Sequence, residues 1–179
     1  MERNSVYDKL TIRDVRADDA LILSEIYSYY VENTAVSFEY KAPTEEEFRD
    51  RIMKITKDYP YIVCELGGDI VGYAYAGRYS ERAAYDLTAA SSIYVEKDHR
   101  RCGIGSAMYK VLIEKLKERG IVNLMAGTAY IDRNDEYLTD ASFRFHDHMG
   151  FEKAGHFKQI GKKFDRWYDL IWMQKKIDK

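Results

Sequence analysis

The sequence predicts an α+β domain built on a central mixed, mostly antiparallel sheet of about six or seven strands, flanked by about four helices. Two strand-like runs, 61–66 and 70–76, are joined by Gly67-Gly68-Asp69, and glycines that tolerate positive φ favour a tight antiparallel hairpin. A third run, 87–95, leads through a glycine-containing turn into a helical pattern and then into another strand-like run, 124–129. A strand, helix and strand in that order favour a parallel pair, so the sheet is expected to be mixed.

The first third of the chain predicts one strand and two helices. Residues 10–15 alternate apolar and polar side chains, which is typical of a half-buried strand. Apolar residues then recur at steps of three and four from Asp18-Asp19 to about Asn33, which predicts the first helix. Thr44 is a capping residue followed by three glutamates, and these acids favour a helix start, so a second helix is expected to run to about Asp58.

The rest of the chain predicts two further helices and the last strands. Apolar side chains at helical spacing extend from Ile104 to Leu116, and Gly120 marks the end of that helix. A short helix is expected over 140–149, followed by strands over 151–157 and 166–173. The sequence contains no internal repeat or linker, so we expect one domain over about 8–176.

Composition limits the classes of function. The chain has 179 residues, of which 46% are hydrophobic and 32% charged, as in a folded globular protein. The net charge of −2 argues against a nucleic-acid partner. No apolar run is long enough for a signal peptide core or a membrane span, so we expect a cytoplasmic protein with no membrane partner. Cys64 and Cys102 lie far apart, and the histidines do not cluster, so we expect no disulfide and no metal.

The turn between the strand at 87–95 and the following helix is a candidate phosphate site. Two glycines let the backbone bend so that consecutive N–H groups point outward, and the helix N-terminus adds a partial positive charge. The turn matches neither the Walker A pattern nor the dinucleotide fingerprint, and a helix cap with surface arginines is the alternative interpretation. The residues of this turn are Arg100, Arg101, Cys102, Gly103, Ile104, Gly105 and Ser106.

This turn resembles the R/Q-x-x-G-x-G/A turn of GNAT acetyltransferases, and the resemblance extends over nearly the whole chain. Within that superfamily the sequence is similar to the phosphinothricin and methionine-sulfone acetyltransferases. The segments that carry this similarity are NTAVSFE (33–39), VGYAYAG (71–77), RAAYD (82–86), RFHDHMGF (144–151) and RWYD (166–169).

The resemblance implies a fold, a cosubstrate and a reaction. The sheet would splay between its fourth and fifth strands, and acetyl-CoA would lie in that wedge against the backbone of Ile93, Tyr94 and Val95. An N–H near Tyr94 or Val95 would polarise the thioester carbonyl. The primary amine of a small amino-acid-like substrate would attack the thioester directly, without a covalent acetyl-enzyme. The family commonly forms homodimers with the pocket near the subunit boundary, so a homodimer is expected.

His146 is the candidate for proton transfer, because the group carries a histidine at this position of its short helix. A neutral imidazole can accept the amine proton, and an imidazolium can protonate the departing sulfur; the sequence leaves both roles open. Ser142 lies one turn earlier on the same helical face. It is expected to contact the cofactor, to orient His146, or to be an ordinary surface serine.

Two departures from the group bear on the mechanism. Ala90 stands where the herbicide-acetylating relatives have a glutamate proposed as the base, so that base is missing here. The stretch 129–140 is longer than in the group and carries four acids: Asp132, Asp135, Glu136 and Asp140. These acids are expected either to line a pocket for an ammonium group or to belong to a solvated loop.

Three further residues match positions that shape the amino-acid pocket of this group. Arg82 would pair with a substrate carboxylate, and Tyr85 and Phe38 would wall the pocket. The alternatives are a surface arginine, an interface tyrosine and a core phenylalanine.

Two other functions remain open at this level. The chain would acetylate a different amine, such as a protein N-terminus or a polyamine, or would bind acetyl-CoA without turnover. The missing carboxylate at Ala90 is compatible with the second alternative.

Overall fold

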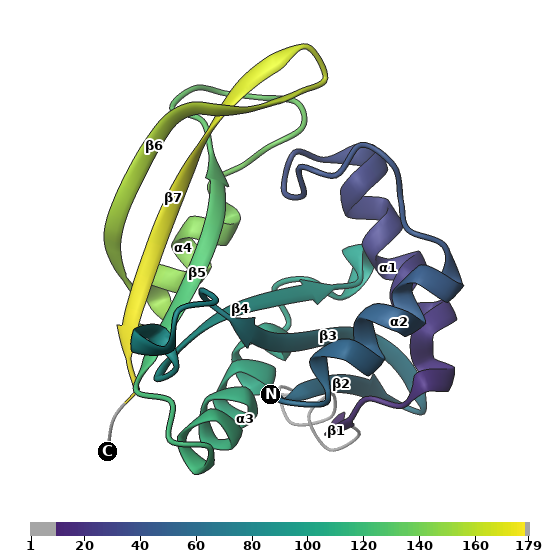
Figure 1. Ribbon diagram of the computed structural model, residues 1–179. Helices are drawn as coiled ribbons and strands as arrows, with labels where there is room; N and C mark the ends of the chain where they lie inside the picture. The colour runs from purple at the N-terminus through teal and green to yellow at the C-terminus, as the bar shows by residue number, and fades with distance from the viewer. Residues whose placement is uncertain (1–9, 178–179) are drawn as a thin grey trace, which may run out of the picture.

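The computed structural model describes residues 10–177 as one seven-stranded sheet with helices on both faces (Figure 1). Residues 8 and 9, with which the expected domain begins, lie outside the described residues. The strands lie in the order β1-β2-β3-β4-β5-β7-β6. They are β1 (Leu10–Asp14), β2 (Tyr61–Leu66), β3 (Asp69–Arg78), β4 (Thr88–Val95), β5 (Asn123–Tyr130), β6 (Glu152–Lys163) and β7 (Arg166–Lys176). The α-helices are α1 (Ala20–Asn33), α2 (Glu45–Ile55), α3 (Ile104–Glu118) and α4 (Ala141–His148).

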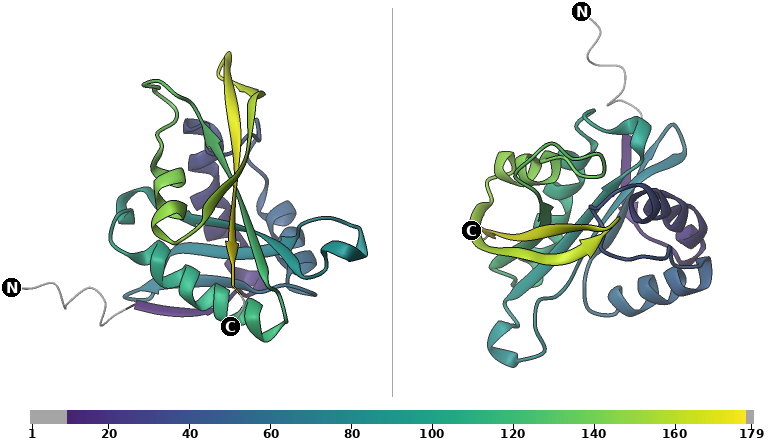
Figure 2. Two further views of the ribbon diagram at one scale, coloured as in Figure 1. Left: turned by 90° about the vertical axis from the view of Figure 1, so that its left-hand side faces the viewer. Right: turned by 90° about the horizontal axis from the view of Figure 1, so that it is seen from above.

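The sheet divides between β4 and β5. β4 pairs with β3 in antiparallel register from Ala89 to Val95, whereas its parallel pairing with β5 covers only Thr88↔Asn123, Ala89↔Leu124 and Ala90↔Met125. Beyond Ala90 the two strands diverge, and β5, β7 and β6 rise away from the rest of the sheet (Figures 1 and 2). The expected splay between the fourth and fifth strands is confirmed.

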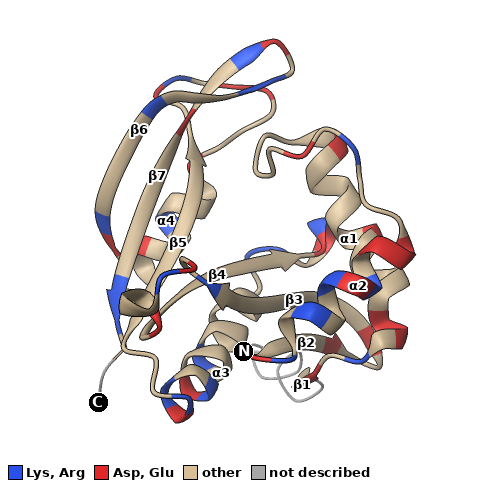
Figure 3. Cartoon of the chain, viewed as in Figure 1, with Lys and Arg blue, Asp and Glu red and all other residues tan. Residues whose placement is uncertain are grey.

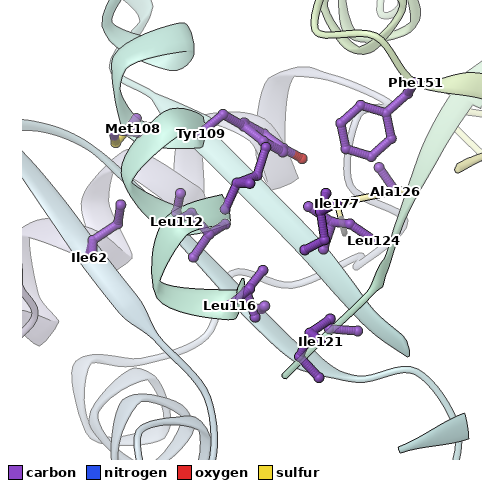
Figure 4. Close-up of a cluster of buried hydrophobic side chains, with 14 of the residues drawn as sticks. Ile62, Met108, Tyr109, Leu112, Leu116, Ile121, Leu124, Ala126, Phe151 and Ile177 are labelled. Carbon is purple, nitrogen blue, oxygen red and sulfur yellow. The ribbon is translucent and has the colours of Figure 1, made fainter. Parts of the chain in front are cut away.

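Two apolar clusters hold the helices against the sheet. α3 buries Met108, Leu112 and Leu116 against strand residues such as Ile62 and Leu124, as Figure 4 shows. α1 and α2 cover the opposite face, where the cluster is rich in tyrosine: Tyr27, Tyr30, Tyr61 and Tyr73. α3 therefore covers one face of the sheet from β2 to β5, and its Tyr109 hydroxyl lies 2.8 Å from Ser91, the first residue beyond the β4–β5 pairing.

Some element boundaries differ from those predicted. α2 begins with the expected Thr44 cap but ends at Ile55, about a turn before the predicted end. β6 extends to Lys163 rather than stopping near 157, because Gly161, Lys162 and Lys163 pair with the start of β7 after an irregularity in register. The β6 strand lacks a regular alternation of polar and apolar residues, so its full length could not be predicted from the sequence pattern.

Acidic and basic residues are mixed along α3, whereas α2 begins with three glutamates and carries its basic residues further along, and the charged residues of α1 are both glutamates (Figure 3). Within residues 10–177, none of the helices combines the length and apolar character that a membrane crossing requires.

Candidate active site

A cavity lies in the wedge between β4 and β5, beyond their last paired residues. One wall is the second half of β4, the opposite wall is the second half of β5, and α4 closes the side. The lining residues are Val36, Ser91, Ser92, Ile93, Tyr94, Gly127, Thr128, Ala129, Leu138, Ser142 and His146. The divergence of two parallel strands therefore creates a pocket with exposed backbone at its edge.

The register of β4 determines which backbone groups face this cavity. Glu96 N donates to Val71 O at 2.8 Å, so Val95 and Gly72 form a non-hydrogen-bonded pair of the antiparallel ladder. By alternation, the N–H and C=O of Ser91, Ile93 and Val95 point away from β3, whereas those of Tyr94 point toward it. The Val95 carbonyl accepts from the Tyr30 hydroxyl. Of the two amides considered from sequence, that of Val95 points away from β3, whereas that of Tyr94 is paired with β3.

His146 is held on the cavity wall by two hydrogen bonds. Its side chain is buried, and its Nδ1 lies 2.8 Å from the carbonyl oxygen of Ser142 in the preceding turn of α4. Its Nε2 lies 2.9 Å from the Tyr109 hydroxyl of α3. Because a carbonyl only accepts, Nδ1 carries a proton. Ser142 thus orients the imidazole through its main chain, which sequence could not distinguish from a role for its hydroxyl.

Burial lowers the pKa of His146, and the hydrogen bond to Ser142 opposes that shift only in part. The imidazole is therefore neutral at pH 7, with Nε2 available as an acceptor. Asp and Glu residues are absent from the cavity lining formed by residues 10–177. His146 is thus the lining side chain whose titration range lies closest to neutrality.

The turn before α3 has the geometry of an anion site. Arg101 and Gly103 both have positive φ, 63° and 79°, and Gly103 is the residue that precedes the first turn of the helix. Such a turn directs successive amides toward one side, in front of the helix N-terminus. Arg100, Arg101 and Cys102 are exposed, while Ile104 is buried and anchors the helix.

Gly105 brings this turn close to the cavity. A Cβ at this position would lie 3.1 Å from the Phe145 ring of α4. The missing side chain lets the first turn of α3 pack against Phe145 of α4 beside Ile93, which lines the cavity.

Residues 12–172 match the family model described as an acetyltransferase (GNAT) domain. The chain belongs to the GNAT acetyltransferase family. This assignment makes it an N-acetyltransferase, and its parallel β4–β5 pair and wedge are those of the GNAT fold.

The most similar proteins include three that are informative for this acetyltransferase. It is 30% identical to the phosphinothricin N-acetyltransferase of Streptomyces viridochromogenes, over 93% of this chain and 87% of that protein. It is 29% identical to the L-methionine sulfoximine/L-methionine sulfone acetyltransferase of Salmonella typhimurium, over 94% and 95%. The crystal structure of a Sinorhizobium meliloti phosphinothricin acetyltransferase in complex with AcCoA aligns with a TM-score of 0.85, 32% identity and coverage of 94% and 88%.

In the acetyltransferase, the α1–α2 connection contacts the tip of the β6–β7 hairpin. These two segments, residues 34–40 and 161–165, are called the roof below. Lys163 at the tip is buried and donates to the carbonyls of Thr34 and Ser37 at 2.8 and 2.7 Å, and the Tyr40 hydroxyl donates to Lys162 O at 2.6 Å. Burial lowers the pKa of Lys163, which the charge of Glu39 opposes. These contacts join segments more than a hundred residues apart.

Phe38 belongs to this roof. Its ring lies 6.3 Å from that of Tyr168, which is fully buried on β7. Phe38 is not among the residues that line the cavity. Its role in binding an acceptor stays a prediction.

Arg82 and Tyr85 lie elsewhere, on the β3–β4 connection, which projects from the body of the domain (Figure 2). Both are exposed. Arg82 precedes the short 3-10 helix η3 (Ala83–Tyr85), and Tyr85 ends it, with its ring 5.7 Å from that of Tyr79. Neither lines the cavity of this single chain. The structure therefore separates them from Phe38, and their pocket roles stay predictions.

The acidic stretch 129–140 is largely neutralised by arginines. The side chain of Asp135 is buried, and this burial tends to raise its pKa. Hydrogen bonds from Arg166, the Tyr137 N–H and the Tyr168 hydroxyl outweigh burial and hold the pKa of the carboxyl below its ordinary value. Arg166 also lies 3.3 Å from Glu136, and Asp140 pairs with Arg144 at 2.6 Å. These acids anchor the loop to β7 and α4.

Two site residues escaped the sequence analysis: Tyr109 and Ser91. Tyr109 follows the apolar pattern of α3 and is fully buried, so it resembles an ordinary core residue. Ser91 is one of two adjacent serines in β4, and such a polar pair inside a predicted strand is the signal that could have drawn attention to it. Within residues 10–177, no group of three or more His, Cys, Asp or Glu side chains is arranged to hold a metal.

Proposed function

We propose that this acetyltransferase transfers an acetyl group from acetyl-CoA to the primary amine of a small amino-acid-like molecule, of the phosphinothricin, methionine sulfone or methionine sulfoximine type. The observation that carries the proposal is the wedge cavity. It is lined by β4 and by a neutral buried histidine, and β4 leads through the 100–106 turn into the N-terminus of α3.

Acetyl-CoA would bind along the wedge. The amides of the 100–106 turn and the exposed Arg101 suit a diphosphate, and Ser106 lies in the first turn of α3. The outward-facing groups of Ile93 and the N–H of Val95 suit the amides of a pantetheine arm. The Val95 N–H is also the donor for the thioester carbonyl, whose oxygen becomes more negative as the amine attacks.

His146 would manage the proton of the amine. Because its pKa is lowered, it is neutral at pH 7 and can accept that proton, then return it to the departing sulfur. This assignment also explains how the protein works with Ala90 in β4. A covalent acetyl-enzyme is not required, since a free amine is a competent nucleophile.

The roof supports a small acceptor over a folded protein or a long peptide. The buried Lys163 and the exposed Tyr40 tie the hairpin tip to the α1–α2 connection, and this is expected to narrow access to the cavity from that side. The named activities of the relatives also involve small amino-acid-like molecules.

The projecting Arg82 and Tyr85 fit the proposal if the protein forms a homodimer. In this arrangement the β3–β4 connection of one subunit lies near the cavity of the other, and Arg82 pairs with the acceptor carboxylate. Arg82→Ala is then expected to raise the KM for the acceptor about tenfold or more while leaving the affinity for acetyl-CoA unchanged.

The test is an assay of CoA release with acetyl-CoA and a panel of amines: phosphinothricin, methionine sulfone, methionine sulfoximine, spermidine and an N-terminal peptide. Turnover with one of the first three supports the proposal. Turnover with the peptide or spermidine alone contradicts the substrate class. Tight acetyl-CoA binding without transfer to any amine contradicts the enzymatic reaction.

A further inference from the structure

Both ring nitrogens of His146 are engaged within the protein. Nδ1 faces the Ser142 carbonyl, and Nε2 faces the Tyr109 hydroxyl. His146 lines the cavity, but the residue is only 4% exposed. Its ring makes T-shaped contacts with the rings of Tyr109, Phe145 and Phe151. A proton from an amine in the cavity therefore meets an imidazole whose acceptor nitrogen is already occupied.

A hydrogen-bonded chain leads from that nitrogen back to the cavity. The Tyr109 hydroxyl lies 2.9 Å from His146 Nε2 and 2.8 Å from Ser91 Oγ. Ser91 lines the cavity, at the first residue of β4 beyond its pairing with β5, and its Oγ lies 3.2 Å from the Met125 carbonyl. Figure 4 shows the Tyr109 hydroxyl at the edge of the apolar cluster, on the side of Phe151.

The hydrogen bonds that join Ser91, Tyr109 and His146 can run in either of two directions. With neutral His146, the Ser91 hydroxyl donates to Tyr109, and Tyr109 donates to Nε2. With charged His146, Nε2 donates to Tyr109, Tyr109 donates to Ser91, and Ser91 donates to Met125 O. Reversing these bonds moves one proton between the cavity and His146, and both His146 Nε2 and the Tyr109 hydroxyl are paired in each state.

We propose that Tyr109 is a positioning residue for catalysis that, together with Ser91, connects His146 to the amine in the cavity. This inference rests on the proposed function. The amine gives a proton to Ser91 Oγ as Ser91 passes its own to Tyr109 and Tyr109 passes its own to His146 Nε2. The reverse sequence delivers that proton to the CoA sulfur, so the amine loses one proton, the thiolate gains one, and the three side chains return to their starting state.

The surroundings favour a relay over a charged tyrosine. Burial raises the pKa of the Tyr109 hydroxyl, which the hydrogen bond from Ser91 opposes, so Tyr109 stays protonated at neutral pH. In the described part of the chain, Tyr109 of α3 is the titratable side chain bonded to His146; the other contacting rings, from α4 and the residue before β6, are phenylalanines.

The experiment is steady-state kinetics of Tyr109→Phe with the best amine from the panel. This change keeps the ring and removes only the hydroxyl. We expect kcat to fall by about tenfold to 100-fold, KM for acetyl-CoA to stay within about twofold, and the acidic limb of the kcat/KM profile to move. Tyr61→Phe, in the buried cluster of the other sheet face, is the matched control and is expected to keep wild-type kinetics.

Two further variants separate a relay from a packing effect. In the double variant Tyr109→Phe/His146→Ala, turnover should equal that of His146→Ala alone, because both changes interrupt one path. Ser91→Ala should lower kcat like Tyr109→Phe, and Ser91→Thr, which restores a hydroxyl, should recover most of it. If Tyr109→Phe does not fold, the kcat values of Ser91→Ala and Ser91→Thr test the relay instead.

The outcomes distinguish this inference from the proposed function. A wild-type protein that acetylates no amine overturns both. An active wild type with unchanged kcat and pH profile in Tyr109→Phe overturns only the relay. Multiplicative losses in the double variant also overturn it, since Tyr109 would then act independently of His146.

Discussion

The two ends of β4 differ in their pairing: the beginning is paired with β5, and the rest borders the cavity. At its beginning, Ala89 is fully buried and pairs with Leu124 of β5 over the α3 cluster. From Ser91 onward β4 has no strand partner on that side, and polar contacts replace the ladder: Ser91 bonds to Met125 O and to Tyr109. The closed end contributes stability and the open end contributes binding groups, because unpaired strand backbone next to a cavity is available to a ligand.

This contrast also explains why the polar chain sits where it does. A diverging strand pair leaves buried backbone groups that must find new partners. The Ser91 hydroxyl lies 3.2 Å from one of them, the Met125 carbonyl, and its contact with Tyr109 brings Tyr109 and His146 into the same network. A structural requirement of the splay thus supplies the polar path that we assign to catalysis.

The largest effect is expected at the closed end. Leu124→Ala removes a fully buried side chain beneath the paired strands and is expected to lower the free energy of unfolding by about 2–5 kcal/mol. Denaturant unfolding measures this loss. The folded fraction should retain kcat within about twofold; a large fall in kcat at unchanged stability would contradict the division between the two ends.

At the open end, His146→Ala is expected to lower kcat by about 100-fold or more while the Kd for acetyl-CoA changes little. The reason is that this variant removes the proton acceptor but leaves the β4 backbone and the turn intact. His148→Ala is the control, because His148 is exposed on the same helix. Equal turnover of wild type and His146→Ala would remove His146 from the mechanism.

The anion turn beside the open end is tested by Gly103→Val. The φ of 79° at Gly103 disfavours a β-branched residue, so the turn should distort and the Kd for CoA should rise about tenfold or more by calorimetry. Gly67→Val strains a similar φ of 65° in the remote β2–β3 hairpin. It should leave the Kd unchanged; an equal rise in both variants would indicate general destabilisation.

The smallest effect is a pH dependence of stability. Because the pKa of His146 is lowered in the folded state, the unfolded chain binds its proton more readily, and this contribution to stability is lost as pH falls from about 7 through 6.5 toward the lowered pKa. The difference in unfolding free energy between wild type and His146→Gln should therefore shrink between pH 7 and 5. A difference that grows toward acid would contradict the assigned shift.

Local patterns were sufficient to predict much of the fold. The hairpin at Gly67-Gly68, the Thr44 cap and the periodic face of α3 are short-range signals, so these elements appear close to their expected positions. The length of the β6–β7 hairpin was underestimated, because residues 161–163 are stabilised by pairing with β7 and by the hydrogen bonds of Lys163 to Thr34 and Ser37. Such partners lie far away in the sequence.

The sequence by itself determined the family resemblance and the glycine turn at Gly103, and it made His146 a candidate for proton transfer. Only the tertiary structure decided which β4 amide faces the wedge, that both nitrogens of His146 are occupied, and that Tyr109 and Ser91 link it to the cavity. The physical reason is that residue type and spacing encode local geometry, whereas a hydrogen-bonded chain across β4, α3 and α4 exists only once packing brings the three elements together.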